Sequence, residues 1–315
     1  MHPALSVIFF TTTSGAGYGL LTILGICYFF QISPLSFVFG LSAIGIAVTL
    51  ITTGLLSSTF HLGHPERAWR ALSQWRSSWL SREGILAIVT YIPIVILTTG
   101  WLFLKSESAL YVIAALTMSM LCLLTVYATS MIYASLKTVH AWCNHWVPLV
   151  YISIAIMTGM LLLNALLLVF STPLPAITYA SLVSVVVTFI IKIAYWHFIK
   201  NTNSASTAET ATGLGHLGKV KLLQSPHSQE NYLLKEMGFQ IARKHSDKLR
   251  RICVICGFVI PFLLTLVIQD VASSLSIVSA ILAVVISLIG IVVERWLFFA
   301  EAKHTVMLYY GSSSA

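Results

Sequence analysis

The chain has 315 residues, of which 57% are hydrophobic and only 9% are charged. This charged share is roughly a third of that in an average soluble domain, which excludes a soluble globular protein. The formal net charge of +8 is explained by the distribution of basic residues along a membrane protein, as set out below, and requires no nucleic-acid partner.

Eight apolar runs are long enough to cross about 30 Å of hydrocarbon as helices. The alternation typical of barrel strands is absent, and only helices or closed barrels satisfy the backbone in lipid. The sequence therefore predicts an all-α integral membrane protein, with residues 1–315 forming a single transmembrane domain. The eight predicted helices cover residues 5–30, 36–60, 84–104, 109–133, 147–171, 176–199, 253–270 and 274–293.

The first run begins as "MHPALSVIFF". It lacks a preceding basic region, and its apolar stretch continues beyond the length of a signal peptide. We therefore expect it to be retained as the first membrane span.

Basic residues are concentrated in alternate connections. Connections 61–83, 134–146 and 200–252, together with the segment after the eighth run, carry 16 Lys and Arg residues, including Arg295. The opposite side carries only Lys105. The positive-inside rule then places these connections and both termini in the cytoplasm.

The longest connection, 201–252, is expected to be a cytoplasmic loop between the sixth and seventh helices. Its start, "NTNSASTAETATG", is rich in Ser and Thr and typical of a flexible segment. Its end has apolar residues at helical spacing among basic residues, which predicts an amphipathic helix over 231–250. Such a helix would suit either a partner protein or anionic lipid headgroups.

The connection "HLGHPERAWRALSQWRSSWLSREG", residues 61–84, contains two histidines, four arginines, two glutamates and three tryptophans. Tryptophan prefers the headgroup zone, and arginine binds lipid phosphates. Pro65 is compatible with the first position of a short helix. An interfacial helix with an aromatic belt explains most of these residues.

His61 and Glu83 lie at the membrane boundary, on the ends of the second and third runs. An ionisable group at membrane depth is a functional candidate, because burying its charge is costly. Together the two residues predict a site where a lipid-soluble molecule exchanges protons with the cytoplasm. Two structural interpretations remain open: Glu83 as a charge at a helix N-terminus capped by Ser81, and His61 as a hydrogen-bond partner of a loop carbonyl.

Three further features fall inside the apolar runs. Lys192 is the only clear charge within a run, and it either extends to the interface or faces a cavity. Asn164 is expected to form an interhelical hydrogen bond. Gly15 and Gly19 form a GxxxG pattern, which predicts a close helix contact.

Cysteine and histidine give weak indications of metal chemistry. Cys253 and Cys256 are three residues apart on an expected helix, where two small buried side chains are the simpler interpretation. A haem would need two axial histidines facing each other across the bundle, and the sequence does not reveal such a pair. The histidines near the cytoplasmic ends are His140, His145, His197 and His304.

Three segments resemble the membrane-anchor subunits of the DMSO reductase family, most closely the branch that anchors the cytoplasmic sulfite dehydrogenase. The segments are "SSTFHLGHPERAWRALSQWRSSWLSREG", "ENYLLKEMGFQIARKHSDKLRR" and "ERWLFFAEAKHTVMLYYG". The resemblance extends across all eight expected helices.

This resemblance implies a complex of three subunits: a catalytic subunit with a molybdopterin cofactor, a subunit with iron–sulfur clusters, and this anchor. The anchor is expected to hold no metal and to bind a quinone, either ubiquinone or menaquinone. The family links a histidine in an HLG motif, and a glutamate that follows a serine by two positions, to the quinone site. These motifs fall on His61 and Glu83, with Gly63 permitting close backbone approach and Arg70 and Arg82 as further candidates.

The expected partner-docking surface comprises Arg67, Arg76, Lys235, Arg243 and Lys244. The cytoplasmic placement of this surface departs from periplasmic DMSO reductase, whose catalytic arm faces the other side. It favours the sulfite-oxidising branch, in the cytoplasmic membrane of a bacterium, with electrons passing from sulfite through the iron–sulfur subunit to quinone.

Other functions remain open at this stage. One is the anchor of a reductase of DMSO or another oxyanion, which oxidises quinol. Another is a passive scaffold without quinone chemistry. A secondary transporter is disfavoured, because paired broken helices and several midplane charges are missing.

The topology is open to a direct test. A reporter fused after Ala315 should show cytoplasmic activity, because the basic connections lie on the same side as the C-terminus. Periplasmic activity of the fusion would contradict the orientation and the preference for a cytoplasmic catalytic partner.

Overall fold

The computed structural model describes most of the chain. Six of the residues singled out from the sequence lie outside the described residues: His61, Gly63, Lys105, Lys235, Arg243 and Lys244. Most of the amphipathic helix expected over 231–250 also lies outside them. The described residues are 4–32, 36–59, 64–104, 108–202, 204–224, 226, 227, 229, 231, 234, 237, 245–268 and 273–312.

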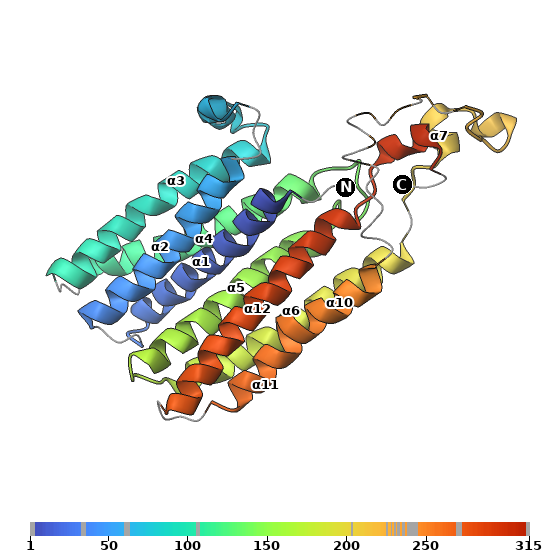
Figure 1. Cartoon of the computed structure of the whole chain (residues 1–315). Coiled ribbons are helices and arrows are strands. Elements are labelled where there is room, and N and C mark those ends of the chain that lie inside the picture. Colours follow the sequence, from blue (N-terminus) through green and yellow to red (C-terminus); the bar gives the residue numbers. More distant parts are fainter. Residues whose placement is uncertain are drawn as a thin grey trace.

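The prediction of eight membrane-spanning helices is confirmed within these residues (Figure 1). Two of the spans contain a π-helical segment, in which one turn holds an extra residue: the third span ends in one, and the seventh has one in its middle. In chain order the spans are α1 (Leu5–Phe29), α2 (Phe37–Thr59), α3 (Trp79–Thr98) with η2 (Thr99–Leu104), α4 (Ala109–Ala134), α5 (Trp146–Val169), α6 (Pro175–Asn201), α10 (Ser246–Val254) with η4 (Ile255–Val259) and α11 (Ile260–Leu266), and α12 (Ser274–Ala300).

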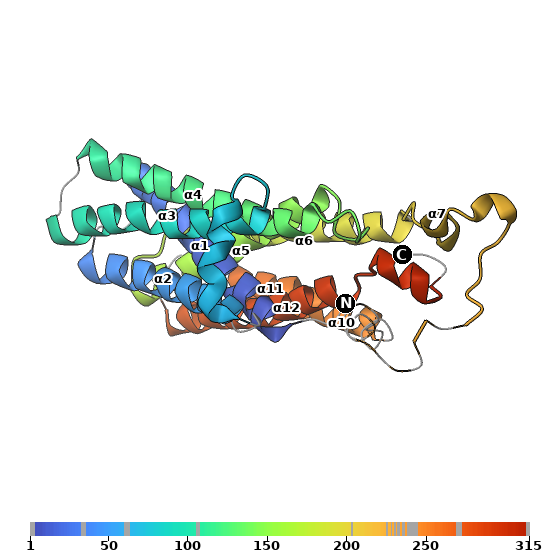
Figure 2. The ribbon, with the colours of Figure 1, turned by 90° about the horizontal axis from the view of Figure 1, so that it is seen from above.

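Helix α1 begins and helix α12 ends at the same end of the bundle, here called the terminal end (Figures 1 and 2). A 3₁₀ helix, η1 (Pro65–Gln74), runs across the bundle at this end, as Figure 2 shows. The other short elements of the terminal end are α7 (Ala208–Thr212), η3 (Gly215–Leu217) and η5 (Thr305–Tyr310). Helix α7 falls in the Ser/Thr-rich stretch expected to be flexible, where a capping box between Thr207 and Thr210 stabilises it.

Two span boundaries differ from the prediction in ways that affect function. Helix α3 starts at Trp79 rather than residue 84, so Glu83 lies inside the helix. Helix α12 extends to Ala300, so Arg295 is a buried residue within the span and not a loop charge. In both places hydropathy ended the run early, because it scores a charge as polar even where a buried partner satisfies it.

Helix α1 is the central helix, and glycines allow its neighbours to approach closely. A Cβ on Gly17 would lie 2.7 Å from the backbone oxygen of Ala47 in α2. A Cβ on Gly19 would lie 1.8 Å from the oxygen of Ala155 in α5. The close contact expected of the GxxxG pattern is therefore confirmed for Gly19, whereas a Cβ on Gly15 would meet nothing within 4 Å.

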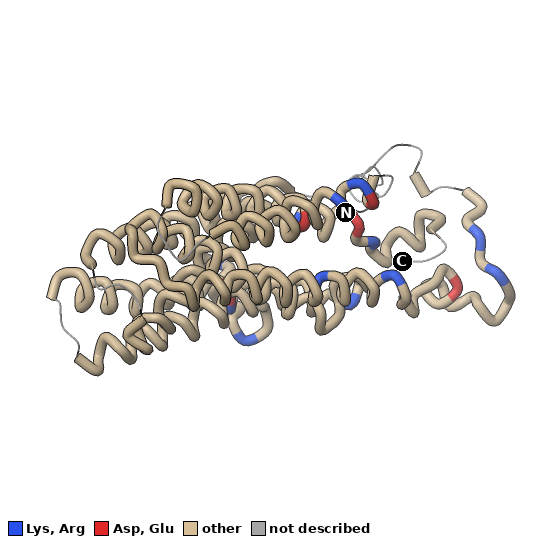
Figure 3. Tube along the Cα trace, turned by 90° about the horizontal axis from the view of Figure 1, so that it is seen from below, with Lys and Arg blue, Asp and Glu red and all other residues tan. Residues whose placement is uncertain are grey.

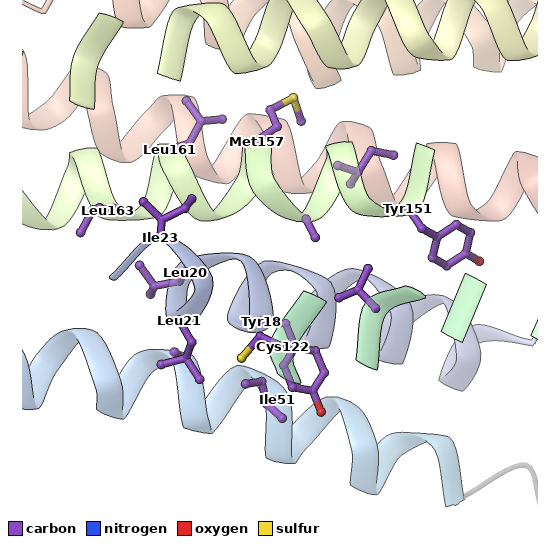
Figure 4. Close-up of a cluster of buried hydrophobic side chains, with 14 of the residues drawn as sticks. Tyr18, Leu20, Leu21, Ile23, Ile51, Cys122, Tyr151, Met157, Leu161 and Leu163 are labelled. Atoms are coloured by element: carbon purple, nitrogen blue, oxygen red, sulfur yellow. The ribbon is translucent and has the colours of Figure 1, made fainter. Parts of the chain in front are cut away.

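Apolar packing fills the interior away from the terminal end. Figure 4 shows Leu20, Leu21 and Ile23 of α1 and Leu161 and Leu163 of α5 in one buried apolar cluster, to which Tyr18 and Tyr151 also belong. Asn164 forms the expected interhelical hydrogen bond, accepting from the Thr178 hydroxyl of α6 at 2.9 Å.

Charged residues gather at the terminal end of the chain trace (Figure 3). The described loop residues there include Arg67, Arg70, Arg76, Lys137 and Lys219. The fold thus separates an apolar membrane region from a basic end, with a small number of buried charges between them.

The Gly19 contact predicts a strong effect of one methyl group. Replacing Gly19 with Ala should lower the midpoint of thermal unfolding of the purified protein in detergent, followed by circular dichroism, because the methyl group meets backbone that cannot rotate away. Overpacking of this kind typically costs about 1–3 kcal/mol. Gly45→Ala is the matched control, since its Cβ would meet nothing within 4 Å. Equal midpoints for the two variants would contradict the close α1–α5 contact.

Candidate quinone site and the buried polar row

The Glu83 carboxyl is buried near the terminal end, with the residue only 5% exposed. It lies four residues into α3, roughly 6 Å along the helix from Trp79. Its Oε1 accepts a hydrogen bond from the Thr129 hydroxyl of α4 at 2.5 Å. A carboxyl held inside the membrane with one hydroxyl partner is placed to exchange a proton with a bound molecule.

The local reason for this position differs from the expected cap. The residue that precedes α3 is Ser78, whose side chain makes no capping hydrogen bond. Ser81 is not the N-cap: it lies inside α3 and is buried, because α3 begins five residues earlier than predicted. Glu83 therefore faces α4 instead of the solvated start of a helix.

Arg82 holds the η1 connection against α3. Its Nε donates to the Trp75 carbonyl at 2.9 Å and its second terminal nitrogen to the Arg76 carbonyl at 2.7 Å. Its guanidinium also stacks over Trp79, 4.4 Å from the ring centroid. Gly84 leaves room for Leu72 of η1, since a Cβ there would lie 2.9 Å from the Leu72 side chain. Arg82 is thus a structural clamp for this connection.

An apolar groove of about 590 Å³ runs along the outer face of α3 and α4 below this connection. Arg82 and Leu86, which flank Glu83 on α3, both line it, and Ala128 beside Thr129 lines it on α4. Trp79 and Tyr127 pack edge to face there at 5.8 Å. The groove has the apolar and aromatic lining that suits a long hydrocarbon chain. We name it the α3–α4 groove.

A second buried polar group joins α6 to α12. Lys192 forms an ion pair with Glu294, and Arg295 lies 3.5 Å from the other carboxylate oxygen of Glu294. All three residues are at most 1% exposed. Lys192 is therefore not the lone charge within the spans that hydropathy suggested, and the pairing explains why it is buried instead of extending to the interface.

Tyrosines occupy the space between this ion group and Glu83. The Arg295 guanidinium lies 3.7 Å from the centroid of the Tyr151 ring. Tyr151 stacks with Tyr133 of α4 at 6.0 Å. Both Tyr133 and Tyr151 are close enough to interact electrostatically with Glu83 and with Arg295.

A small cavity, here called the interior chamber, lies beside these tyrosines. Its volume of about 10 Å³ is the size needed for a single water. Tyr18, Thr129, Tyr151 and Arg295 are among its lining residues. Thr129 therefore contacts the chamber and Glu83 at once.

The other predicted site and docking residues that the structure describes lie at the surface of the terminal end. Arg67 and Arg70 lie in η1, Arg76 follows it, and all three are exposed. Arg67 lies 3.7 Å from Glu66, and Arg70 and Arg76 stack over Trp69 and Trp75 respectively. Of the predicted quinone residues that the structure describes, Glu83 is buried, Arg82 is partly buried in its contacts with the η1 connection, and Arg70 is exposed.

Sequence reasoning missed Thr129 and Glu294. Thr129 is one of many hydroxyl residues in apolar runs, and nothing in the sequence pairs it with Glu83. A signal for Glu294 was available, because a glutamate and an arginine follow directly on an apolar run of normal hydropathy. Extending that run by two turns would have placed both charges inside the helix.

Eight apolar helices, a basic terminal end and a buried carboxyl just inside that end define a multi-pass membrane subunit of the anchor class. The family model for the DMSO reductase anchor subunit (DmsC) matches residues 1–311. The chain belongs to this family and is a membrane anchor subunit of an oxidoreductase.

A curated relative points to one branch. The chain is 31% identical over 334 residues to the C subunit of sulfite dehydrogenase from Allochromatium vinosum, and the alignment covers 99% of each chain. No solved structure matches the chain significantly.

The clamp role of Arg82 makes a prediction about the η1 connection. Arg82→Ala should speed chymotrypsin cleavage after Trp69 and Trp75, because two backbone carbonyls lose their donor and the connection is released from α3. Cleavage is measured on purified protein by mass spectrometry of the fragments. Arg70→Ala is the matched control, since Arg70 only stacks on an exposed ring. Equal cleavage rates for both variants would rule out the clamp.

Proposed function

We propose that this subunit is the quinone-reactive membrane anchor of a three-subunit molybdopterin oxidoreductase. Electrons from sulfite oxidation on the catalytic subunit would pass through an iron–sulfur subunit to ubiquinone or menaquinone bound in this chain. The substrate assignment rests on the similarity to the C subunit of a sulfite dehydrogenase over nearly the whole chain. The catalytic chemistry itself would reside on the partner chain.

The observation that carries the quinone proposal is the buried Glu83 carboxyl, whose neighbours on α3, Arg82 and Leu86, line the α3–α4 groove. Quinone reduction consumes two protons, so the reacting oxygens need a proton-transfer group within reach. Glu83 supplies that group, and Thr129 holds its carboxyl in place. The groove offers the apolar surface for the isoprenoid chain, with the headgroup at the level of Glu83.

The role of His61 remains part of this proposal. The sequence places it at the end of the second span, on the same side of the membrane as Glu83. A histidine there would donate a hydrogen bond or a proton to the second quinone oxygen. Gly63 would permit close approach of the connecting backbone.

The exposed terminal end is proposed as the docking surface for the iron–sulfur subunit, on the cytoplasmic side of a bacterial inner membrane. Arg67 and Arg76 present positive charge there beside the exposed rings of Trp69 and Trp75. Lys235, Arg243 and Lys244 are proposed to belong to this surface from the sequence alone, because they lie outside the described residues. Arginine and tryptophan are the side chains that most often dominate the energetics of protein interfaces.

The decisive substitution is Glu83→Gln, which keeps the shape of the side chain and removes the carboxyl. Quinone-linked turnover of the purified complex should fall by about 10²-fold or more, the usual loss on removing a proton-transfer group. Oxidation of sulfite with an artificial dye as acceptor should be unchanged, because that reaction bypasses the anchor.

Glu66→Gln is the matched control, since Glu66 lies in the same connection with its side chain 64% exposed. Normal quinone reduction by Glu83→Gln would remove Glu83 from the site. Complete assembly together with an absence of quinone-linked activity in the parent complex would indicate a passive scaffold.

A further inference from the structure

A polar vestibule opens at the terminal end between α6, α10 and α12. Its volume is about 490 Å³, and charged side chains line it, including Lys200, Asp247, Arg250 and Glu301. Arg250 and Glu301 form an ion pair with an N–O distance of 3.0 Å. A cavity of this size and polarity is suited to water.

Tyr195 lies where the vestibule meets the buried ion group. Its hydroxyl donates to the Ala141 carbonyl at 3.1 Å, and the residue lines the vestibule. On its other side the Lys192 ammonium lies 4.5 Å from its ring centroid. Trp196 also lies between them, its ring centroid 5.0 Å from the Lys192 ammonium and 5.7 Å from the Arg250 guanidinium, so two aromatic side chains separate the vestibule from the first buried charge.

From Lys192 the ionisable side chains follow one another across the bundle. Lys192 pairs with Glu294, Glu294 contacts Arg295, and Arg295 stacks on Tyr151. Arg295 and Tyr151 line the interior chamber, which Thr129 joins to Glu83. In Figure 1, helices α1, α5 and α12 lie between α3 and the pair α6 and α10, so this row crosses the bundle from one side to the other.

Other titratable groups face the row from the neighbouring helices. Tyr133 on α4 interacts electrostatically with Glu83 and Arg295. Tyr195 on α6 and Cys253 on α10 interact in the same way with Glu294. No acidic side chain other than Glu83 and Glu294 lies within the buried row as far as the structure describes it.

The row contains more buried charged groups than are needed to hold α6 against α12. A single Lys–Glu pair would suffice to hold α6 against α12, yet a second buried cation follows it. Within the described residues, Arg295 Nε and the Tyr18 hydroxyl have no hydrogen-bond partner. Burying such groups without partners is unfavourable, and both residues line the chamber of one-water size.

We propose that the row Lys192–Glu294–Arg295–Tyr151 is a proton-transfer path that joins the vestibule to Glu83. The inference rests on the proposed function, because it supplies the proton that quinone reduction consumes at that site. When Glu83 donates a proton to a quinone oxygen it becomes a carboxylate, while the two electrons arrive from the iron–sulfur partner. A proton entering at the vestibule would pass from Lys192 to the Glu294 carboxylate and then, through a water in the interior chamber and the Tyr151 hydroxyl, to Glu83. Arg295 keeps its own proton and holds Glu294 and that water in place. Each quinol formed then takes up two protons from the terminal side.

The first test variant removes the path and preserves the net charge of the cluster. In Lys192→Met/Glu294→Gln, a cation and an anion disappear together, and the new amide oxygen would still face Arg295. Arg295 loses its counterion in this variant, so assembly of the complex is measured first. The second variant, Tyr151→Phe, keeps the ring beneath Arg295 and removes only the hydroxyl. Tyr111→Phe on α4, packed near Gly100 at the opposite end, is the matched control.

Each variant is purified as the full complex, and quinone-linked and dye-linked sulfite oxidation are measured in H₂O and in D₂O. The path predicts that maximal quinone-linked turnover falls about 10-fold or more in the double variant and measurably in Tyr151→Phe, with KM for quinone unchanged. The ratio of rates in H₂O and D₂O should rise in both variants, because proton delivery becomes limiting. Dye-linked oxidation and the Tyr111→Phe control should match the parent.

The outcomes separate this inference from the proposed function. Full quinone-linked turnover in Tyr151→Phe and in an assembled double variant would contradict the proton path. The buried charges would then serve only to hold α6 against α12. If the double variant does not assemble, the test rests on Tyr151→Phe alone. Unchanged quinone-linked turnover and an unchanged H₂O/D₂O rate ratio in that variant would then contradict the proton path. A normal rate in Glu83→Gln refutes the quinone site itself, whatever the path variants do.

Discussion

The cost of placing ionisable groups in hydrocarbon governs this structure. Each charge at membrane depth costs about 2.5–3.5 kcal/mol on insertion scales unless the bundle provides a partner. Lys192, Glu294 and Arg295 are stable because α6 and α12 bring opposite charges together. Glu83 depends in the same way on Thr129 of α4. The buried polar groups therefore require the packing of the helices that carry them, and the central glycines of α1 make that packing possible.

This constraint also sets where chemistry can take place. Apolar side chains form the buried cluster that Figure 4 shows. The buried charges of the described residues, Glu83, Lys192, Glu294 and Arg295, lie in the part of the bundle nearer the terminal end. A lipid-soluble acceptor would reach this region through the groove between α3 and α4, while protons would reach it through the polar vestibule beside α10. Substrate and protons can thus enter from different sides, and the two entrances would meet at Glu83.

Most of the fold could be predicted from the sequence, because hydropathy over 20 residues is a strong signal and the bilayer leaves few alternatives. Glu83 could also be found, since an acidic residue beside an apolar run is conspicuous. The hydrogen-bond partner of Glu83 and the ion-pair partner of Lys192 could not be predicted from the sequence. Thr129 and Glu294 lie 46 and 102 positions away from them in the chain, and only tertiary packing brings each pair together. Hydropathy also placed Arg295 in solvent, because it cannot distinguish a charge in water from a charge with a buried partner.

The central claim is that the quinone headgroup binds beside Glu83 at the terminal end of α3 and α4. A photoreactive quinone analogue bound to the intact complex, with the modified residues identified by mass spectrometry, tests it directly. The account predicts adducts within residues 79–86 and 124–129, reduced by competition with unmodified quinone. Adducts confined to the opposite end of the bundle, around 99–104 or 166–174, would contradict it.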